Sequence, residues 1–277
     1  MCIRDSLYSS LHIAIGALLF AFEAYMLYRL PVDKGYLALV FCSTLLIYSL
    51  HRIIGIKHTV PDNNQGRFAI IRKYKNHIAI YAALAFVGCL VSIIFTPIDI
   101  IILLCPIGLI SLAYVLPILN KKRRLRDLNL IKIFLIAVTW AYVGSIPLAF
   151  NKLPMDILVV SFLEKTIFIL LITLPFDIRD IKIDRLTNLT TIPIAIGVKS
   201  TYILCYCLFI IGLTLFYFLD DHILSSPVFV LSGLIIYTTC FFAIEVSKNK
   251  VKDIYYGGLI DGTLVIRGVV IFLASLH

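Results

Sequence analysis

Charged residues are scarce in this sequence, because Asp, Glu, Lys and Arg make up only 15% of its 277 residues while hydrophobic residues make up 61%. Soluble globular domains carry roughly 25% charged residues, so the composition excludes an ordinary soluble domain. Cysteine motifs are also lacking: no Cys-x-x-Cys occurs, and all of the cysteines except Cys2 fall inside apolar runs. We expect these cysteines to act as small apolar residues in helix packing.

The sequence is rich in long apolar runs. A transmembrane helix needs about 20 such residues, and continuous runs lack the alternation of a membrane β-barrel. We therefore predict an all-α integral membrane protein, a nine-transmembrane-helix bundle that forms one domain over residues 7–277. The predicted spans are Leu7–Leu30, Tyr36–Ile56, Ile78–Phe95, Ile98–Leu116, Leu130–Phe150, Ile157–Phe176, Thr201–Leu219, Pro227–Val246 and Leu259–Leu276.

The stretch from Met1 to Ser6 differs in character from the rest of the chain. It resembles the translation of a transposon-end adapter used in sequencing libraries. We expect residues 1–6 to be an assembly scar and exclude them from the fold argument.

The formal net charge is +9, which in a soluble chain would indicate nucleic acid as a partner. Here the basic residues gather in the connections after the even-numbered spans, and the positive-inside rule makes those connections cytoplasmic. We therefore expect a cytoplasmic N-terminus, a bacterial inner-membrane location and no nucleic-acid partner. The densest basic cluster follows span four and contains Lys121, Lys122, Arg123, Arg124 and Arg126.

Three aspartates follow span six with the spacing i, i+3, i+7: Asp177, Asp180 and Asp184. On a helix this spacing places all three carboxylates on one face. Like charges on one stripe repel, so the pattern is consistent with a divalent cation, most plausibly Mg²⁺ carrying a phosphorylated substrate. The alternative is a solvated helix end in which Arg179, Lys182 and Arg185 compensate the acids.

Charged residues also occur at membrane depth. Glu23 falls in span one, the adjacent Glu164 and Lys165 in span six, and Arg267 in span nine. Such residues normally face a bundle interior. Asp261 and Arg267 lie nearly two helical turns apart, so they either pair loosely or each face an interior cavity.

The segment from Asp177 to Ser200 reads Asp-x-x-Asp-x-x-x-Asp-Arg followed by Thr-Ile-Pro-x-x-Ile-Gly. It resembles the second aspartate-rich motif of the UbiA-type membrane prenyltransferases, as do the nine-span layout and the connection that begins at Tyr114. The resemblance implies a helical bundle in which aspartate-rich motifs on spans two and six hold Mg²⁺ against a prenyl diphosphate. It implies transfer of the prenyl group to an aromatic or other lipophilic acceptor.

One departure from that pattern concerns span two. The first aspartate-rich motif of the family would end this span, but residues 48–56 contain no acid. Asp62, in the following loop, replaces one ligand at most. This loss favours an alternative in which the protein keeps the fold without catalysis and binds an isoprenoid or lipid, or partners another enzyme.

The favoured hypothesis is nevertheless an enzyme with one divalent site. The predicted catalytic and metal-binding residues are Asp177, Asp180 and Asp184, with Mg²⁺ as the cofactor. Basic side chains are expected to share the binding of the diphosphate, and aromatic side chains to form walls for a carbocation. The predicted substrate-binding residues are Arg52, Arg72, Lys73, Lys121, Lys122, Arg123, Lys132, Arg179, Tyr48 and Tyr114, with Trp140 as a further wall residue.

Overall fold

The computed structural model describes residues 10–58, 73–116, 124–219, 226–249 and 255–276. Every regular element within these residues is helical, as predicted. Eight helices are long and apolar enough to cross a membrane, and α2 is a shorter apolar helix. These helices are α2 (Leu11–Leu27), α3 (Lys34–His58), α5 (Lys75–Phe95), α6 (Ile98–Val115), α7 (Ile131–Phe150), α8 (Met155–Leu186), α10 (Val198–Tyr217), α12 (Pro227–Ser247) and α14 (Gly262–Ser275), the last preceded by the π-helix η3 (Tyr256–Ile260).

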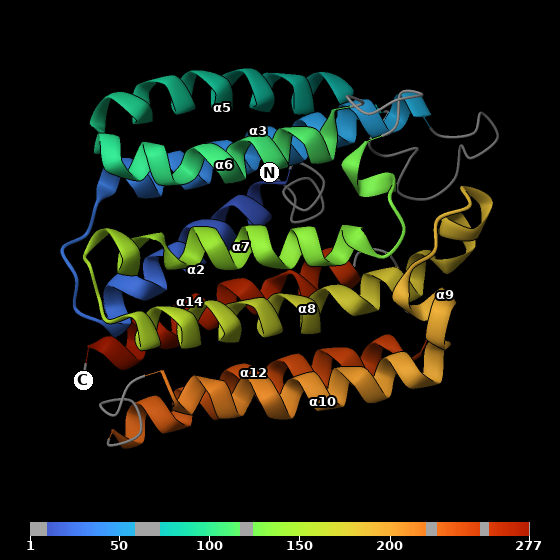
Figure 1. The fold of residues 1–277 in the computed structure, drawn as a ribbon. Helices are drawn as coiled ribbons and strands as arrows, with labels where there is room; N and C mark the ends of the chain where they lie inside the picture. The colour runs from blue at the N-terminus through green and yellow to red at the C-terminus, as the bar shows by residue number, and fades with distance from the viewer. Residues whose placement is uncertain (1–9, 59–72, 117–123, 220–225, 250–254, 277) are drawn as a thin grey trace.

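The long helices lie side by side in one bundle (Figure 1). Helix α3 packs against α5, α7 against α8, and α10 against both α8 and α12, while α14 returns to pack against α2. Large apolar side chains face outward, as on α5, where Ile94 is 77% exposed and Leu84 is 63% exposed. An apolar exterior of this kind requires a lipid environment, so the fold is that of an integral membrane protein.

Helix α8 is the longest element, and it continues ten residues beyond the predicted end of span six at Phe176. Polar residues sustain a helix in water as well as apolar ones do in lipid, so the end of the apolar run did not mark the end of the helix. Gly197 then separates the short helix α9 (Ile192–Ile196) from α10 with φ +85°, a conformation that favours glycine. In Figure 1 the overhang of α8, the start of α7 and α9 occupy one end of the bundle, called here the α9 end.

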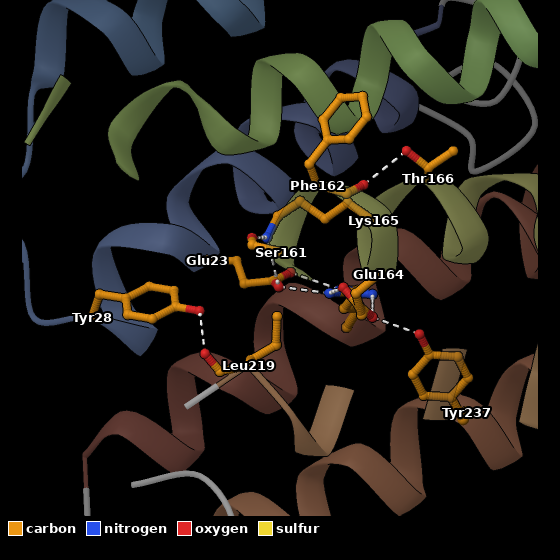
Figure 2. Close-up of polar contacts among 10 residues, drawn as sticks. Glu23, Tyr28, Ser161, Phe162, Glu164, Lys165, Thr166, Leu219 and Tyr237 are labelled. Carbon is orange, nitrogen blue, oxygen red and sulfur yellow. Dashed lines mark hydrogen bonds and ion pairs between the residues drawn. The ribbon is translucent and has the colours of Figure 1, made fainter. Parts of the chain in front are cut away.

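A network of buried charges ties the chain's two ends together. The Arg267 guanidinium of α14 donates to Glu23 of α2 at 2.6 and 2.7 Å, and to Glu164 of α8 at 2.7 and 2.8 Å. Glu164 also accepts a 2.5 Å hydrogen bond from Tyr237 of α12. Figure 2 shows Glu23 and Glu164 pointing toward each other, with Tyr237 approaching from α12.

The remaining charge in this network is Lys165, which donates to Ser161 at 2.8 Å and lies 3.6 Å from Glu23. All four charged side chains are at most 1% exposed. The two carboxylates and two cations balance, as a low-dielectric interior requires. The network corrects the idea that Asp261 pairs with Arg267, because Asp261 instead lies 3.6 Å from His12.

Aromatic rings enclose the guanidinium of Arg267. Its Cζ lies 4.3 Å from the ring centroid of Phe168 and 5.2 Å from that of Phe20. Trp140 packs edge-on against Phe20, with centroids 6.0 Å apart. Trp140 is therefore part of the packed interior on its Phe20 side.

Candidate functional site

The candidate site lies at the α9 end, where α7 begins beside the overhang of α8. Lys132, the second residue of α7, places its Nζ 2.6 Å from Asp177 Oδ1 and 3.8 Å from Asp184 Oδ2. The side chains of Lys132, Asp177 and Asp184 are 13%, 4% and 10% exposed. Asp177 and Asp184 thus converge on one ammonium group, which brings two of the three predicted carboxylates together.

Asp180 has a different partner. The adjacent Arg179 binds it through two hydrogen bonds of 2.8 and 3.0 Å. The guanidinium of Arg179 also stacks on two rings, 5.0 Å from the centroid of Phe176 and 4.8 Å from that of Tyr256. These rings hold Arg179 in place, so the third carboxylate is neutralised separately from the other two.

Hydrogen bonds from backbone N–H groups fix the position of Lys132 relative to the aspartates. The N–H of Leu130 donates to the carbonyl of Thr190 at 2.9 Å, and the N–H of Thr190 donates to Asn129 Oδ1 at 2.9 Å. These bonds join the residues just before α7 to those just after α8. Leu130 adopts φ 61°, ψ −21°, a left-handed conformation that costs a leucine of order 1–3 kcal/mol. Strained residues that are held in place by neighbouring hydrogen bonds occur often at functional sites.

The connection before α7 contributes cationic side chains. Arg124 directly precedes the short helix η2 (Leu125–Asp127), and its side chain pairs with that of Asp127, the last residue of this helix, at 3.0 and 3.1 Å. Burial raises the pKa of Asp127, but the hydrogen bonds from the Arg124 side chain and backbone outweigh this effect and hold the pKa below its usual range. Arg126 lies within electrostatic range of Asp184 and stacks at 5.6 Å on the ring of Tyr114.

Tyr114, near the end of α6, links this group to α3. Its ring centroid lies 6.5 Å from that of His51. The Tyr48 hydroxyl lies beside Trp140 and within electrostatic range of Arg52 and Tyr114. Tyr114 lies in turn within electrostatic range of Lys132, so this ring connects the aromatic and basic side chains of α3 to the site. Residues 48–58 of α3 contribute no acid, as the sequence indicated.

The other predicted residues divide into two groups. Lys73 is exposed and lies 5.8 Å above the ring of its neighbour Tyr74. Residues Met1 to Ser6, Asp62, Arg72, Lys121, Lys122 and Arg123 lie outside the described residues. Arg126 belongs to the basic cluster that the sequence shows after span four, whereas no sequence pattern indicated a role for Asn129, Thr190 or Tyr256.

An apolar cavity of about 210 Å³ lies elsewhere, among α6, α7 and α8. It is lined by residues such as Leu103, Ile146 and Phe162, near the opposite ends of α7 and α8. It contains none of the predicted site residues. We therefore do not assign it to the site.

Comparison with solved structures identifies the architecture. A UbiA homolog from Aeropyrum pernix K1 matches with a TM-score of 0.65 and 13% identity, over 99% of this chain and 98% of that one. A UbiA homolog from Archaeoglobus fulgidus bound to GPP and Mg²⁺ matches with a TM-score of 0.63 and 10% identity, over 98% and 100%. This chain has the UbiA-type fold. A structure described as digeranylgeranylglyceryl phosphate synthase also matches, with a TM-score of 0.57 and 17% identity over 99% and 98%.

The similarity is one of structure, because no protein-family model and no curated protein sequence matches the chain. The UbiA-type fold predicted from the aspartate motif is confirmed. At these identities the matches establish the fold, while the roles of individual residues stay predictions.

The UbiA-type fold raises the question of whether Mg²⁺ fits this site. Mg²⁺ demands near-octahedral coordination by oxygen. Within the described part of the chain, no group of three or more His, Cys, Asp or Glu side chains is arranged to hold a metal ion. The Lys132 ammonium stands between Asp177 and Asp184, and Asp180 is turned to Arg179. The donors present do not fit the three-carboxylate site expected from the sequence.

Proposed function

We propose that this protein is a membrane prenyltransferase, which transfers the prenyl group of a prenyl diphosphate to an aromatic or other lipophilic acceptor. The observation that carries the proposal is the group formed by Lys132, Asp177 and Asp184 at the α9 end of a UbiA-type bundle. Two matched structures of the Archaeoglobus homolog are bound to GPP and to DMAPP, each with Mg²⁺.

In this reaction the bond between the first prenyl carbon and the diphosphate oxygen breaks, and pyrophosphate leaves with the bonding electrons. The acceptor then attacks the allylic cation and releases a proton. Cationic groups must stabilise the charge that develops on the leaving group. We assign that task to Lys132 and Arg126, which lie near Asp177 and Asp184, with Arg52 of α3, within electrostatic range of Tyr48, as a further cation.

The aromatic side chains have a separate role in the proposal. A carbocation is stabilised by the faces of aromatic rings and must be kept from water. Tyr48 of α3 and Tyr114 of α6 lie within electrostatic range of each other, and Tyr114 also of Lys132, so in this proposal they would line the path of the reacting carbon. The sequence also predicts Mg²⁺, but the carboxylates already have cationic partners, so the proposed reaction uses the protein's own cations and no metal ion.

The test is release of pyrophosphate by the purified protein in detergent or lipid, with prenyl diphosphates of several lengths and a panel of lipophilic acceptors. We expect release in the wild type and a loss of at least tenfold in Asp177→Asn. The assay is run both in EDTA and in excess Mg²⁺, so that turnover is detected whether or not the enzyme requires a metal ion.

A non-catalytic role is the second candidate, and it is favoured by the absence of any acid in residues 48–56. In that case the protein binds an isoprenoid or lipid, or partners another enzyme. No turnover with any donor, together with retained binding of a prenyl diphosphate analogue, would establish this alternative.

A further inference from the structure

The three carboxylates of the site are already matched by cations of the protein. Asp177 has Lys132 at 2.6 Å, and Asp180 has the bidentate Arg179. Asp184 has Lys132 at 3.8 Å and lies within electrostatic range of Arg126. Three negative and three positive side chains leave no excess negative charge to attract a divalent ion.

Lys132 is also able to bind an anion directly. An ammonium group has three N–H donors, and the contact with Asp177 uses one of them. Asp184 Oδ2, at 3.8 Å, is beyond hydrogen-bond distance and has no hydrogen-bond partner. Within the part of the chain that the structure describes, two donors of Lys132 therefore remain, on a side chain that is still 13% exposed.

A metal ion at the same place would meet a like charge. Any divalent ion bound jointly by Asp177 and Asp184 would lie next to the Lys132 ammonium, because both carboxylates converge on that group. Like charges at such distances repel strongly in a partly buried site. Moving Lys132 away would leave its charge without a carboxylate partner among the described contacts. Lys132 and the metal ion thus compete for one position.

We propose that Lys132 is a tethered counter-cation which takes the position of a metal ion, so that the protein binds its diphosphate substrate without a divalent cation. This inference rests on the proposed function, because it specifies how the donor of that reaction is bound. The anion would be held by the two remaining donors of Lys132, with Arg126 and Arg52 adding positive charge from the two flanking segments.

The test is calorimetric titration of the purified full chain with a non-hydrolysable geranyl thiodiphosphate and, separately, with inorganic pyrophosphate. Each titration is made in EDTA and in excess Mg²⁺. We expect the wild type to bind the analogue in EDTA within about threefold of its affinity in Mg²⁺. Lys132→Met is expected to lose roughly 10- to 100-fold in EDTA, since it removes a charge-assisted hydrogen bond.

Addition of Mg²⁺ distinguishes this role from a merely structural one. In Lys132→Met the carboxylates of Asp177 and Asp184 lose their ammonium, so Mg²⁺ should restore binding of the analogue to that variant. Lys132→Arg keeps the charge and should still bind in EDTA. The matched control is Lys182→Met, which removes an exposed lysine from the overhang of α8 at the same end of the bundle. It should leave the affinities in EDTA and in Mg²⁺ unchanged.

The outcomes separate the inference from the function on which it rests. Binding to the wild type only in the presence of Mg²⁺ would overturn the tethered counter-cation and leave the proposed prenyltransferase standing. This result needs no variant, so it holds even if Lys132→Met fails to fold. No binding of the prenyl analogue under either condition would overturn the proposed function, and binding of inorganic pyrophosphate in EDTA would then still support the anion site.

Discussion

Lys132 and Asp177 form the closest contact of the candidate site, with Nζ 2.6 Å from Oδ1 and both side chains largely buried. The two residues lie 45 positions apart in the sequence, on the two helices of a hairpin: Lys132 in the first turn of α7, and Asp177 in the last third of α8. This buried ion pair joins the start of α7 to the last third of α8. The aspartates of α8 are therefore not equivalent, although the sequence presents them as one stripe.

Replacing single aspartates should reveal this difference. Asp177→Asn leaves Lys132 with only the more distant Asp184, so the free energy of unfolding should fall by about 1–3 kcal/mol. Asp180→Asn breaks a pair whose side chains are about one fifth exposed and should cost no more than about 1 kcal/mol. Unfolding in mixed detergent measures both values. Equal losses would show that the three carboxylates act as one group.

The network around Arg267 should dominate the stability of the bundle. Arg267→Met leaves Glu23 and Glu164 buried without their main partner, and breaking such a network costs about 3–5 kcal/mol. Replacing all four charges together, by Glu23→Gln, Glu164→Gln, Lys165→Met and Arg267→Met, should recover much of that loss. A fourfold variant less stable than Arg267→Met would contradict the account.

Glycine permits a close approach between helices at Gly35. A Cβ at this position would lie 2.5 Å from the backbone oxygen of Phe95, which cannot rotate away. Gly35→Ala should therefore lower the free energy of unfolding by about 1–3 kcal/mol. Gly108→Ala is the matched control, since a Cβ there meets nothing within 4 Å. A larger loss in Gly108→Ala than in Gly35→Ala would refute the packing argument.

Acid should weaken the connection before α7 through Asp127. Because Arg124 holds the pKa of Asp127 below its usual range, the pair contributes stability above the unfolded pKa of about 3.9 and loses it as the pH falls through the lower folded value. The free energies of unfolding of the wild type and Asp127→Asn, measured by thermal unfolding, should differ by up to about 1 kcal/mol at pH 7. The difference should vanish in strong acid. If the stability difference between the two proteins instead grew as the pH fell, the proposed stabilisation by ionised Asp127 would be wrong.

Orientation in the membrane follows from the distribution of lysine and arginine. In a cysteine-free background, an engineered thiol at Asp99 should react with an impermeant reagent added from outside, whereas one at Asn188 should react only after permeabilisation. The two positions lie at opposite ends of the bundle, at the start of α6 and just beyond α8. The reverse pattern would place the aspartates on the outer side, away from cytosolic diphosphates.

The sequence predicted the fold well because length and hydropathy decide it. Nine apolar runs became the helices of a UbiA-type bundle, and the i, i+3, i+7 spacing of the aspartates correctly indicated a helix beyond Phe176. Helical spacing shows only which residues share a face of one helix. It does not show that Asp180 turns to its neighbour Arg179.

Pairings between helices were the part that the sequence did not contain. Glu23 and Arg267 were recognisable as charges at membrane depth, yet 244 residues separate them. Lys132 was a weak signal for a different reason. A lysine near a helix end is equally consistent with a side chain that reaches toward the lipid headgroups. Its contact with Asp177 depends on the packing of α7 against α8, which the sequence does not show.

The Glu23–Arg267–Glu164 network also constrains the biosynthesis of the protein. Glu23 enters the membrane with the first described helix, and its guanidinium partner is synthesised 244 residues later. An unneutralised charge at the centre of a span costs about 2.5–3.5 kcal/mol on insertion scales. Lys165 of α8, 3.6 Å from Glu23 in the finished bundle, is synthesised earlier and can offset part of this penalty, but the two hydrogen bonds from a guanidinium come only with α14. Arrival of α14 is thus the step that completes the charge balance around Glu23 and Glu164.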